Sequence, residues 1–125
     1  MIALGRGVAV FAFSEVVDMR KSFDTLAAIV REQMKREVFD GALFVFVGRD
    51  RRRAKVLFWD GTGLCVLAKR LAKGRFAAPW EKAPSGALEW TTSELALFLE
   101  GSEHVGRIAL SPPVWKPSER RVTFT

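Results

Sequence analysis

The chain has 125 residues, of which 49% are hydrophobic, and this length and composition favour a single folded domain over a disordered chain. A single cysteine excludes a disulfide framework and a zinc site built from several cysteines, and the absence of tyrosine excludes a tyrosine nucleophile. The net charge is +6, no secretory signal is visible, and apolar runs such as residues 42–47 are far shorter than the roughly 20 residues that span a bilayer, so we expect a cytoplasmic protein without a membrane segment.

The first third of the chain predicts a strand, a helix and a second strand. Residues 8–13 are apolar and follow two glycines, which favours a strand, and residues 14–21 form a polar connection. The helix that follows has an apolar face at helical spacing, which consists of Phe23, Leu26, Ala27, Val30, Met34 and, at its far end, Val38. Residues 42–47 are apolar at both parities, which is typical of a strand covered on both faces.

The middle of the chain predicts an antiparallel meander that starts with residues 42–47. A basic loop, a strand, a glycine-rich turn and a third strand follow in order, at residues 48–53, 54–60, 61–63 and 64–68. Counting outward from the turn pairs positions near 53–55 with positions near 68–70. We therefore expect the basic loop and the basic segment 69–75 to lie at the same end of the meander.

The last part of the chain predicts a short strand and a second helix. Residues 75–77 are a candidate short strand, residues 79–87 form a loop rich in Pro, Gly and Ser, and residues 88–90 are a further short strand. Thr91 and Glu94 form a capping box at the start of a helix whose apolar face consists of Leu95, Phe98 and Leu99, with Gly101 just past its end.

These elements predict a single α+β domain with an antiparallel β-meander and two helices packed on it. We expect this domain to occupy residues 1–101 and to be followed by a C-terminal tail, residues 102–125, that is extended or partly ordered. Three prolines interrupt the tail and prevent one regular element from running through it.

The excess positive charge is concentrated in residues 49–75. This segment has nine basic residues against two acidic ones, whereas the rest of the chain is nearly neutral. Such a local field attracts phosphate backbones, although many charge runs are only solvated surface. The predominance of arginine favours contact with phosphate or carboxylate groups. The candidate nucleic-acid-binding residues of this segment are Arg49, Arg51, Arg52, Arg53, Lys55, Lys69, Arg70, Lys73 and Arg75.

Two more candidates, Arg20 and Lys21, lie just before the first predicted helix, in the stretch Asp18-Met-Arg-Lys-Ser-Phe-Asp24. Cations at a helix start oppose the helix dipole. One interpretation is local neutralisation by Asp18 and Asp24, with capping by Ser22 or Asp18. The other is an anion site built from Arg20, Lys21 and free backbone N–H groups. The sequence alone leaves both open.

The residues needed for catalysis are few. The chain has one histidine, His104, and a serine or cysteine nucleophile needs a positioned base. The aspartates that could converge on a pair of metal ions show no characteristic spacing; they are Asp18, Asp24, Asp50 and Asp60. The glycines of residues 59–63 suit a hairpin turn better than a phosphate loop. We therefore expect no enzyme activity, no cofactor and no metal site.

Several short motifs, taken together and in order, resemble the accessory protein of IS66-type bacterial insertion sequences, the product of their second reading frame. They cover roughly residues 5–101 and read Gly7-Val8 with Val10, DMRKSFD from Asp18, LFVF with Gly48-Arg49, Lys55 with Leu57, WDGTGL from Trp59, KRL with GRF from Lys69, Pro79, and LxxxLEG from Leu95. The resemblance implies a small cytoplasmic protein that is encoded beside a DDE-type transposase and needed for efficient transposition. It supplies no catalytic residues.

Three hypotheses follow for the function. The first is an accessory factor that binds DNA, at the element ends or non-specifically, through the basic residues named above. The second is a protein–protein adaptor for the transposase of the same element, without direct DNA binding. The third is a metal-dependent nuclease, which requires Asp18, Asp24 or Asp60 to meet in one accessible cleft.

Overall fold

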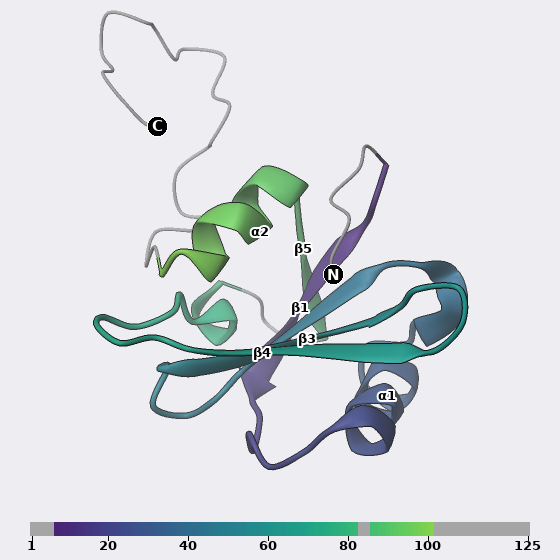
Figure 1. Ribbon diagram of the computed structural model, residues 1–125, viewed down its shortest axis with the longest axis horizontal. Coiled ribbons are helices and arrows are strands. Elements are labelled where there is room, and N and C mark those ends of the chain that lie inside the picture. The colour runs from purple at the N-terminus through teal and green to yellow at the C-terminus, as the bar shows by residue number, and fades with distance from the viewer. Residues whose placement is uncertain (1–6, 83–85, 102–125) are drawn as a thin grey trace, which may run out of the picture.

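A five-stranded mixed sheet in the order β4-β3-β2-β1-β5 organises the chain in the computed structural model, which describes residues 7–82 and 86–101 (Figure 1). The strands are β1 (Val10–Val16), β2 (Leu43–Val47), β3 (Arg53–Trp59), β4 (Leu64–Arg70) and β5 (Ala87–Trp90). The helices are α1 (Phe23–Glu32) and α2 (Thr92–Leu99), with short 3₁₀ turns η1 (Val38–Asp40) and η2 (Pro79–Glu81). The predicted class, a small α+β domain with two helices, is confirmed.

The predicted meander is also confirmed, as strands β2, β3 and β4. Both neighbouring pairs are antiparallel, and β3 and β4 are joined by a tight turn in which the Asp60 N–H donates to the Gly63 carbonyl at 3.1 Å. Arg53 lies opposite Arg70, Ala54 opposite Lys69, and Lys55 opposite Ala68. This register agrees with the pairing obtained by counting outward from the turn.

Strand β1 joins the meander through a crossover. It runs parallel to β2, with α1 in the connection between them, and it pairs with β5 antiparallel on its other side. Parallel neighbours need such a crossover, usually through a helix. The sheet is therefore buried on both faces at its centre, which explains why β2 is apolar at every position.

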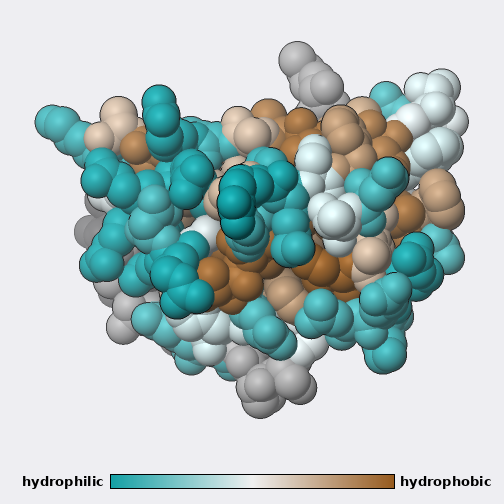
Figure 2. Space-filling view, turned by 90° about the horizontal axis from the view of Figure 1, so that it is seen from below, coloured by the Kyte–Doolittle hydropathy of each residue, from teal (hydrophilic) through white to brown (hydrophobic). Residues whose placement is uncertain are grey.

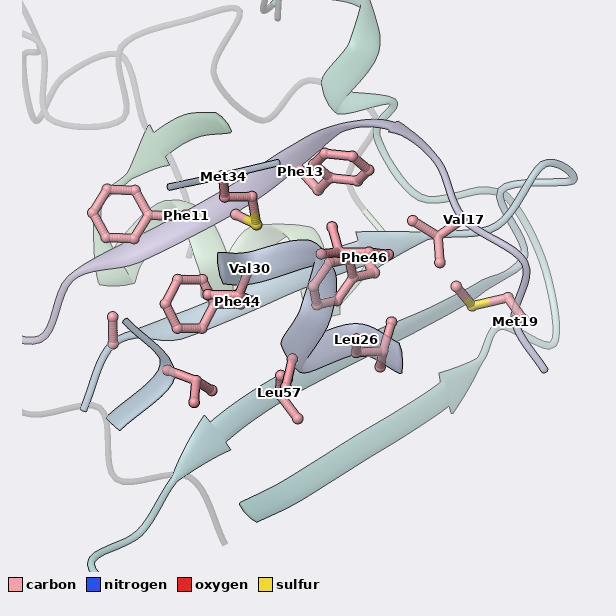
Figure 3. Packing of buried hydrophobic residues seen from close by; sticks show 14 residues of the cluster. Phe11, Phe13, Val17, Met19, Leu26, Val30, Met34, Phe44, Phe46 and Leu57 are labelled. Atoms are coloured by element: carbon pink, nitrogen blue, oxygen red, sulfur yellow. The ribbon is translucent and has the colours of Figure 1, made fainter. Parts of the chain in front are cut away.

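Each face of the sheet carries one helix and one hydrophobic core. On one face α1 contributes Leu26 and Val30 to a core that includes Phe44 and Phe46 of β2 (Figure 3). On the other face Leu95 and Phe98 of α2 pack with alternate residues of the same strands. Figure 1 shows the two helices on opposite sides of the sheet. We call these sides the α1 face and the α2 face.

Two predicted boundaries in the first third of the chain were wrong. The first strand begins at Val10 and continues to Val16, into the connection expected at residues 14–21. It continues because Ser14 is buried and both its N–H and its hydroxyl donate to the Gly86 carbonyl. The first helix ends at Glu32, although Met34 beyond it is buried. Lys35 has a left-handed φ of 58°, so the helix cannot continue through it.

The expected short strand at residues 75–77 is absent. Residues 76–78 are buried, but the segment is held by single contacts rather than by a ladder. The Phe76 N–H donates to the Arg51 carbonyl, and the Phe76 ring stacks on Phe98 of α2 with centroids 4.7 Å apart. The tail at 102–125, which contains His104, lies outside the described residues, and the proposed domain boundary after residue 101 stays a prediction.

Candidate nucleic-acid interface

The basic residues gather at the end of the sheet where β1 and β4 finish and β3 begins. The loop from Gly48 to Arg52 leads into β3, and its backbone is tied to the segment that leaves β4, because the Leu71 N–H donates to the Arg52 carbonyl at 2.8 Å. The connection between β1 and α1 reaches the same place through a hydrogen bond from Lys55 Nζ to the Lys21 carbonyl at 2.7 Å. Three segments distant in sequence thus meet here.

Arg53 and Arg70 form a cross-strand pair of like charges. They lie directly opposite each other, so their side chains point to the same face of the sheet. This is the α1 face, because side chains alternate along a strand and Leu57, four residues after Arg53 in β3, packs in the α1-side core. The hydrogen-bonded pair next to them is Arg52 with Leu71, so Arg53 and Arg70 occupy a non-hydrogen-bonded site, where side chains approach most closely. Like charges at such a site destabilise a sheet.

Little negative charge balances this pair. Asp50 Oδ2 lies 3.8 Å from the Arg53 guanidinium, a long contact between two half-exposed side chains. Asp50 also accepts a hydrogen bond from the Arg52 backbone N–H at 2.9 Å, which fixes the loop. Lys55 lies two positions along β3 from Arg53 on the same face and adds a third cation beside the pair.

A groove of two adjoining hollows runs beside these cations. The first, of about 480 Å³, is lined by residues of the loops, including Asp18, Arg20, Arg49 and Asp50. The second, of about 330 Å³, is lined by residues of β3 and β4 that include Arg53, Lys55 and Arg70 and no carboxylate. Lys69 also lines it, but its side chain lies on the α2 face, where Nζ donates to the Leu99 carbonyl. Met19 and Arg53 line both hollows and so mark the place where they join.

The first hollow is largely neutralised by its own residues. Arg20 makes a bidentate ion pair with Asp18, with Arg20 Nη2 2.7 Å from Asp18 Oδ2 and Nε 3.0 Å from Oδ1. These hydrogen bonds hold the pKa of the Asp18 carboxyl well below its usual range. Local pairing therefore describes Arg20 better than a free anion site does. Lys21 is exposed, and the helix start uses the Ser22 N–H, which donates to Thr25 Oγ1 at 3.1 Å.

The lining shared by the two hollows depends on a close approach between Met19 and Gly48. A Cβ added at Gly48 would come within 2.7 Å of Met19 Cγ, so only glycine lets Met19 lie in this place. Met19 is 9% exposed at the margin of the α1-side core, near Val17 (Figure 3). The sequence analysis missed this contact. The signal available was a glycine directly after a fully apolar strand.

Three of the predicted binding residues hold the surrounding loops in place. Arg51 Nε donates to the Phe76 carbonyl at 2.8 Å, and Arg51 itself has a left-handed φ of 60°. Arg52 Nη2 reaches the Ala72 carbonyl at 3.4 Å. Lys69 Nζ donates to the Leu99 carbonyl at 2.6 Å, where a cation complements the C-terminal end of α2. The remaining predicted residues of the segment, Arg49, Lys73 and Arg75, are exposed.

The carboxylates considered for a nuclease site do not all meet: Asp18 and Asp50 both line the first hollow, where Asp18 is paired with Arg20, but Asp60 lies elsewhere. Asp18 follows β1 at the basic end, whereas Asp60 lies in the β3–β4 turn at the opposite end of the sheet. Asp60 Oδ1 accepts hydrogen bonds from the N–H groups of Thr62 and Gly63 at 2.9 Å, which lower its pKa to about 2. Within residues 7–82 and 86–101 no three His, Cys, Asp or Glu side chains are grouped as metal ligands.

A family model described as IS66 Orf2 like protein matches residues 8–106, which is most of the chain. The chain belongs to this family. The resemblance found in the motifs is thereby confirmed, and this IS66 Orf2-like protein is associated with an insertion sequence.

Two relatives come from Sinorhizobium fredii (strain NBRC 101917 / NGR234). The protein named "Uncharacterized protein y4hO" is 40% identical over 101 residues, which are 81% of this chain and 86% of the relative. The protein named "Uncharacterized protein y4jC" is 31% identical over 101 residues, or 81% of this chain and 85% of the relative. No solved structure matches the chain. None of the helices in the described parts of the chain has the length and apolar character needed to cross a membrane.

Proposed function

We propose that this IS66 Orf2-like protein is a non-catalytic accessory factor of transposition that binds duplex DNA through phosphates seated in the second hollow. The observation that supports this most is the juxtaposition of Arg53 and Arg70 on one face of the sheet, with Lys55 beside them. Like charges placed directly opposite each other weaken a sheet, and a bound anion between them removes that repulsion.

Arginine suits this task because its planar guanidinium can donate two parallel hydrogen bonds to one phosphate. Met19 adds an apolar side chain to the lining of both hollows, and Lys73 and Arg49 are further exposed cations near them. Contacts of this kind position a protein on the DNA backbone and carry no base information. We therefore expect binding that depends steeply on salt and weakly on sequence.

Adaptor activity towards the transposase is the second candidate, and exposed apolar side chains favour it. Phe39 of η1 is 58% exposed and lies edge-on against Trp59, with ring centroids 5.0 Å apart, and Phe23 is 46% exposed. Aromatic residues are enriched in protein interfaces. Figure 2, which views the molecule from the α1 side, shows hydrophobic surface between hydrophilic side chains.

A binding titration separates the two functions. The full-length protein is titrated into a fluorescent duplex of the element end and into a scrambled duplex of equal length, at several salt concentrations. Binding to both that weakens steeply with salt supports the DNA-binding function. Any preference for the element end measures sequence recognition.

A charge-reversed variant then identifies the surface. Arg53→Glu with Arg70→Glu should abolish DNA binding, whereas reversal of Arg51 would also break its hydrogen bond to Phe76 and disturb the fold. If the wild-type protein binds neither duplex at low salt but is captured by purified transposase, the adaptor function replaces the DNA-binding one.

A further inference from the structure

The outer edge of β4 has the properties of a surface that pairs with itself. We propose that β4 pairs antiparallel with β4 of a second copy of this chain, so that two five-stranded sheets become one sheet of ten strands. Among the described residues, β4 has only β3 as a neighbour, and it is seven residues long, whereas the other edge strand, β5, has four.

The unpaired backbone groups of β4 can be assigned from the register. The Leu71–Arg52 and Gly63–Asp60 backbone hydrogen bonds lie at the two ends of the β3–β4 ladder. Because hydrogen-bonded and non-hydrogen-bonded pairs alternate in an antiparallel ladder, the odd-numbered residues between them bond to β3. The N–H and C=O groups that point outward therefore belong to Leu64, Val66, Ala68 and Arg70. Such a row is a template for another strand.

The charges along this edge favour a second copy in the antiparallel direction. Lys69 and Arg70 are the last two residues of β4, and Asp60 lies in the turn before its first residue. Antiparallel pairing brings the basic end of each copy near the Asp60 turn of the other. Parallel pairing would place Arg70 beside Arg70, which is unfavourable for like charges.

The side chains agree with a two-fold axis at Leu67. Pairing centred there uses all seven residues, with Leu64 opposite Arg70 and Val66 opposite Ala68. Leu67 is 40% exposed, and in this arrangement it meets the same residue of the second copy. Basic residues often protect edge strands from pairing, but here they occupy only the last two positions and leave residues 64–68 uncharged.

This dimer would place both copies of the candidate nucleic-acid interface on one side. A two-fold axis perpendicular to the sheet keeps the α1 faces of both copies together. The Arg53–Arg70 pairs would then lie on the same surface, about 20 Å apart along the strand direction, since six residues of β-strand separate them. The dimer itself requires no DNA, so its test stands apart from the test of DNA binding.

The first test is the mass of the full-length chain in solution, measured by light scattering and by sedimentation over a range of concentrations. The expected result for the wild type is twice the chain mass. Ala68→Pro removes an outward N–H without removing a bond to β3, and it should give the chain mass. Ala68→Val is the matched control, since it keeps the N–H, and it should remain dimeric. Circular dichroism of all three checks that the fold is retained.

The second test is a crosslink at the two-fold axis. In a Cys65→Ser background, Leu67→Cys places two thiols at a non-hydrogen-bonded pair, where Cα atoms about 4.5 Å apart allow a disulfide. Oxidation should give a covalent dimer, whereas Thr62→Cys in the same background should not. A wild type with the chain mass up to about 100 µM overturns the proposal. A dimer that persists in Ala68→Pro and fails to crosslink at position 67 also overturns it, because it would use another surface.

Discussion

Removal of the two opposed arginines should weaken DNA binding and strengthen the fold. In the variant Arg53→Gln/Arg70→Gln two cations leave the second hollow, while each glutamine keeps much of the aliphatic part of the side chain. Arg70 makes no ion pair within the described residues, and the Arg53–Asp50 contact is 3.8 Å long and half exposed. In the free protein the variant therefore removes mainly the repulsion between the two guanidinium groups, whereas in the complex it removes mainly their attraction to DNA phosphates.

The size of both effects follows from the geometry. Each phosphate neutralised on B-DNA contributes about 0.9 to the slope of log K against log salt, so two lost contacts should reduce this slope by about 1.8. At about 0.1 M salt, each lost contact should therefore weaken the binding constant roughly eightfold, and the loss of both should weaken it about 60-fold. For the free protein, loss of a like-charge cross-strand pair should raise the free energy of unfolding by about 0.2–1 kcal/mol.

The assays are fluorescence anisotropy with a duplex at four salt concentrations and urea unfolding without DNA. The matched control is Arg31→Gln/Lys82→Gln, which removes the same net charge from exposed positions outside both hollows. The control should leave the slope and the stability nearly unchanged. An equal loss of affinity in both double variants would show that only net charge matters, and it would refute the assignment of the phosphates to the second hollow.

Three further predictions concern the elements that hold the groove. Gly48→Ala should displace Met19 and destabilise the protein by about 1–3 kcal/mol in urea unfolding, as overpacking does, whereas Gly63→Ala, with no atom within 4 Å of the added Cβ, should not. Asp60 has a pKa lowered to about 2, so its ionised form stabilises the fold above the ordinary pKa of 3.8, and this contribution is lost as the pH falls towards 2. The stability advantage of the wild type over Asp60→Asn should therefore shrink between these pH values in acid titrations. An advantage that stays constant over this interval would contradict the assignment. Thr91→Ala removes the hydroxyl that accepts a hydrogen bond from the Glu94 N–H at the start of α2, and it should lower the free energy of unfolding by about 1 kcal/mol in thermal unfolding. An unchanged stability would contradict the role of Thr91 as the helix cap.

The local parts of the fold were predictable from the sequence. The turn at residues 61–63 is short, so it fixes the register of β3 against β4 by counting, and this register brings Arg53 opposite Arg70. The capping box at Thr91 and Glu94 likewise depends on a spacing of three residues and is present in the structure. Such features depend on neighbours in the chain and need no knowledge of the rest of the molecule.

Long-range arrangements were not predictable in the same way. No local pattern shows that β1 pairs with β2 in parallel and with β5 on its other side, because these partners are separated by a helix or by most of the chain. The end of α1 was misplaced for a related reason. Met34 is buried at helical spacing, but it reaches the core from a turn with left-handed Lys35 rather than from the helix.

The charge of residues 49–75 is a poor measure of the binding surface, because the fold gives the cations different tasks. Arg51 and Lys69 use backbone carbonyl groups of other segments as partners and help to hold those segments in place. Arg20 is bound to Asp18 in a hollow that already contains its own counter-charge. Of the two hollows beside the basic residues, the second combines the opposed guanidinium groups with a lining that has no carboxylate. A phosphate entering it would meet cations whose mutual repulsion is already present in the free protein, and relief of that repulsion would add to the attraction.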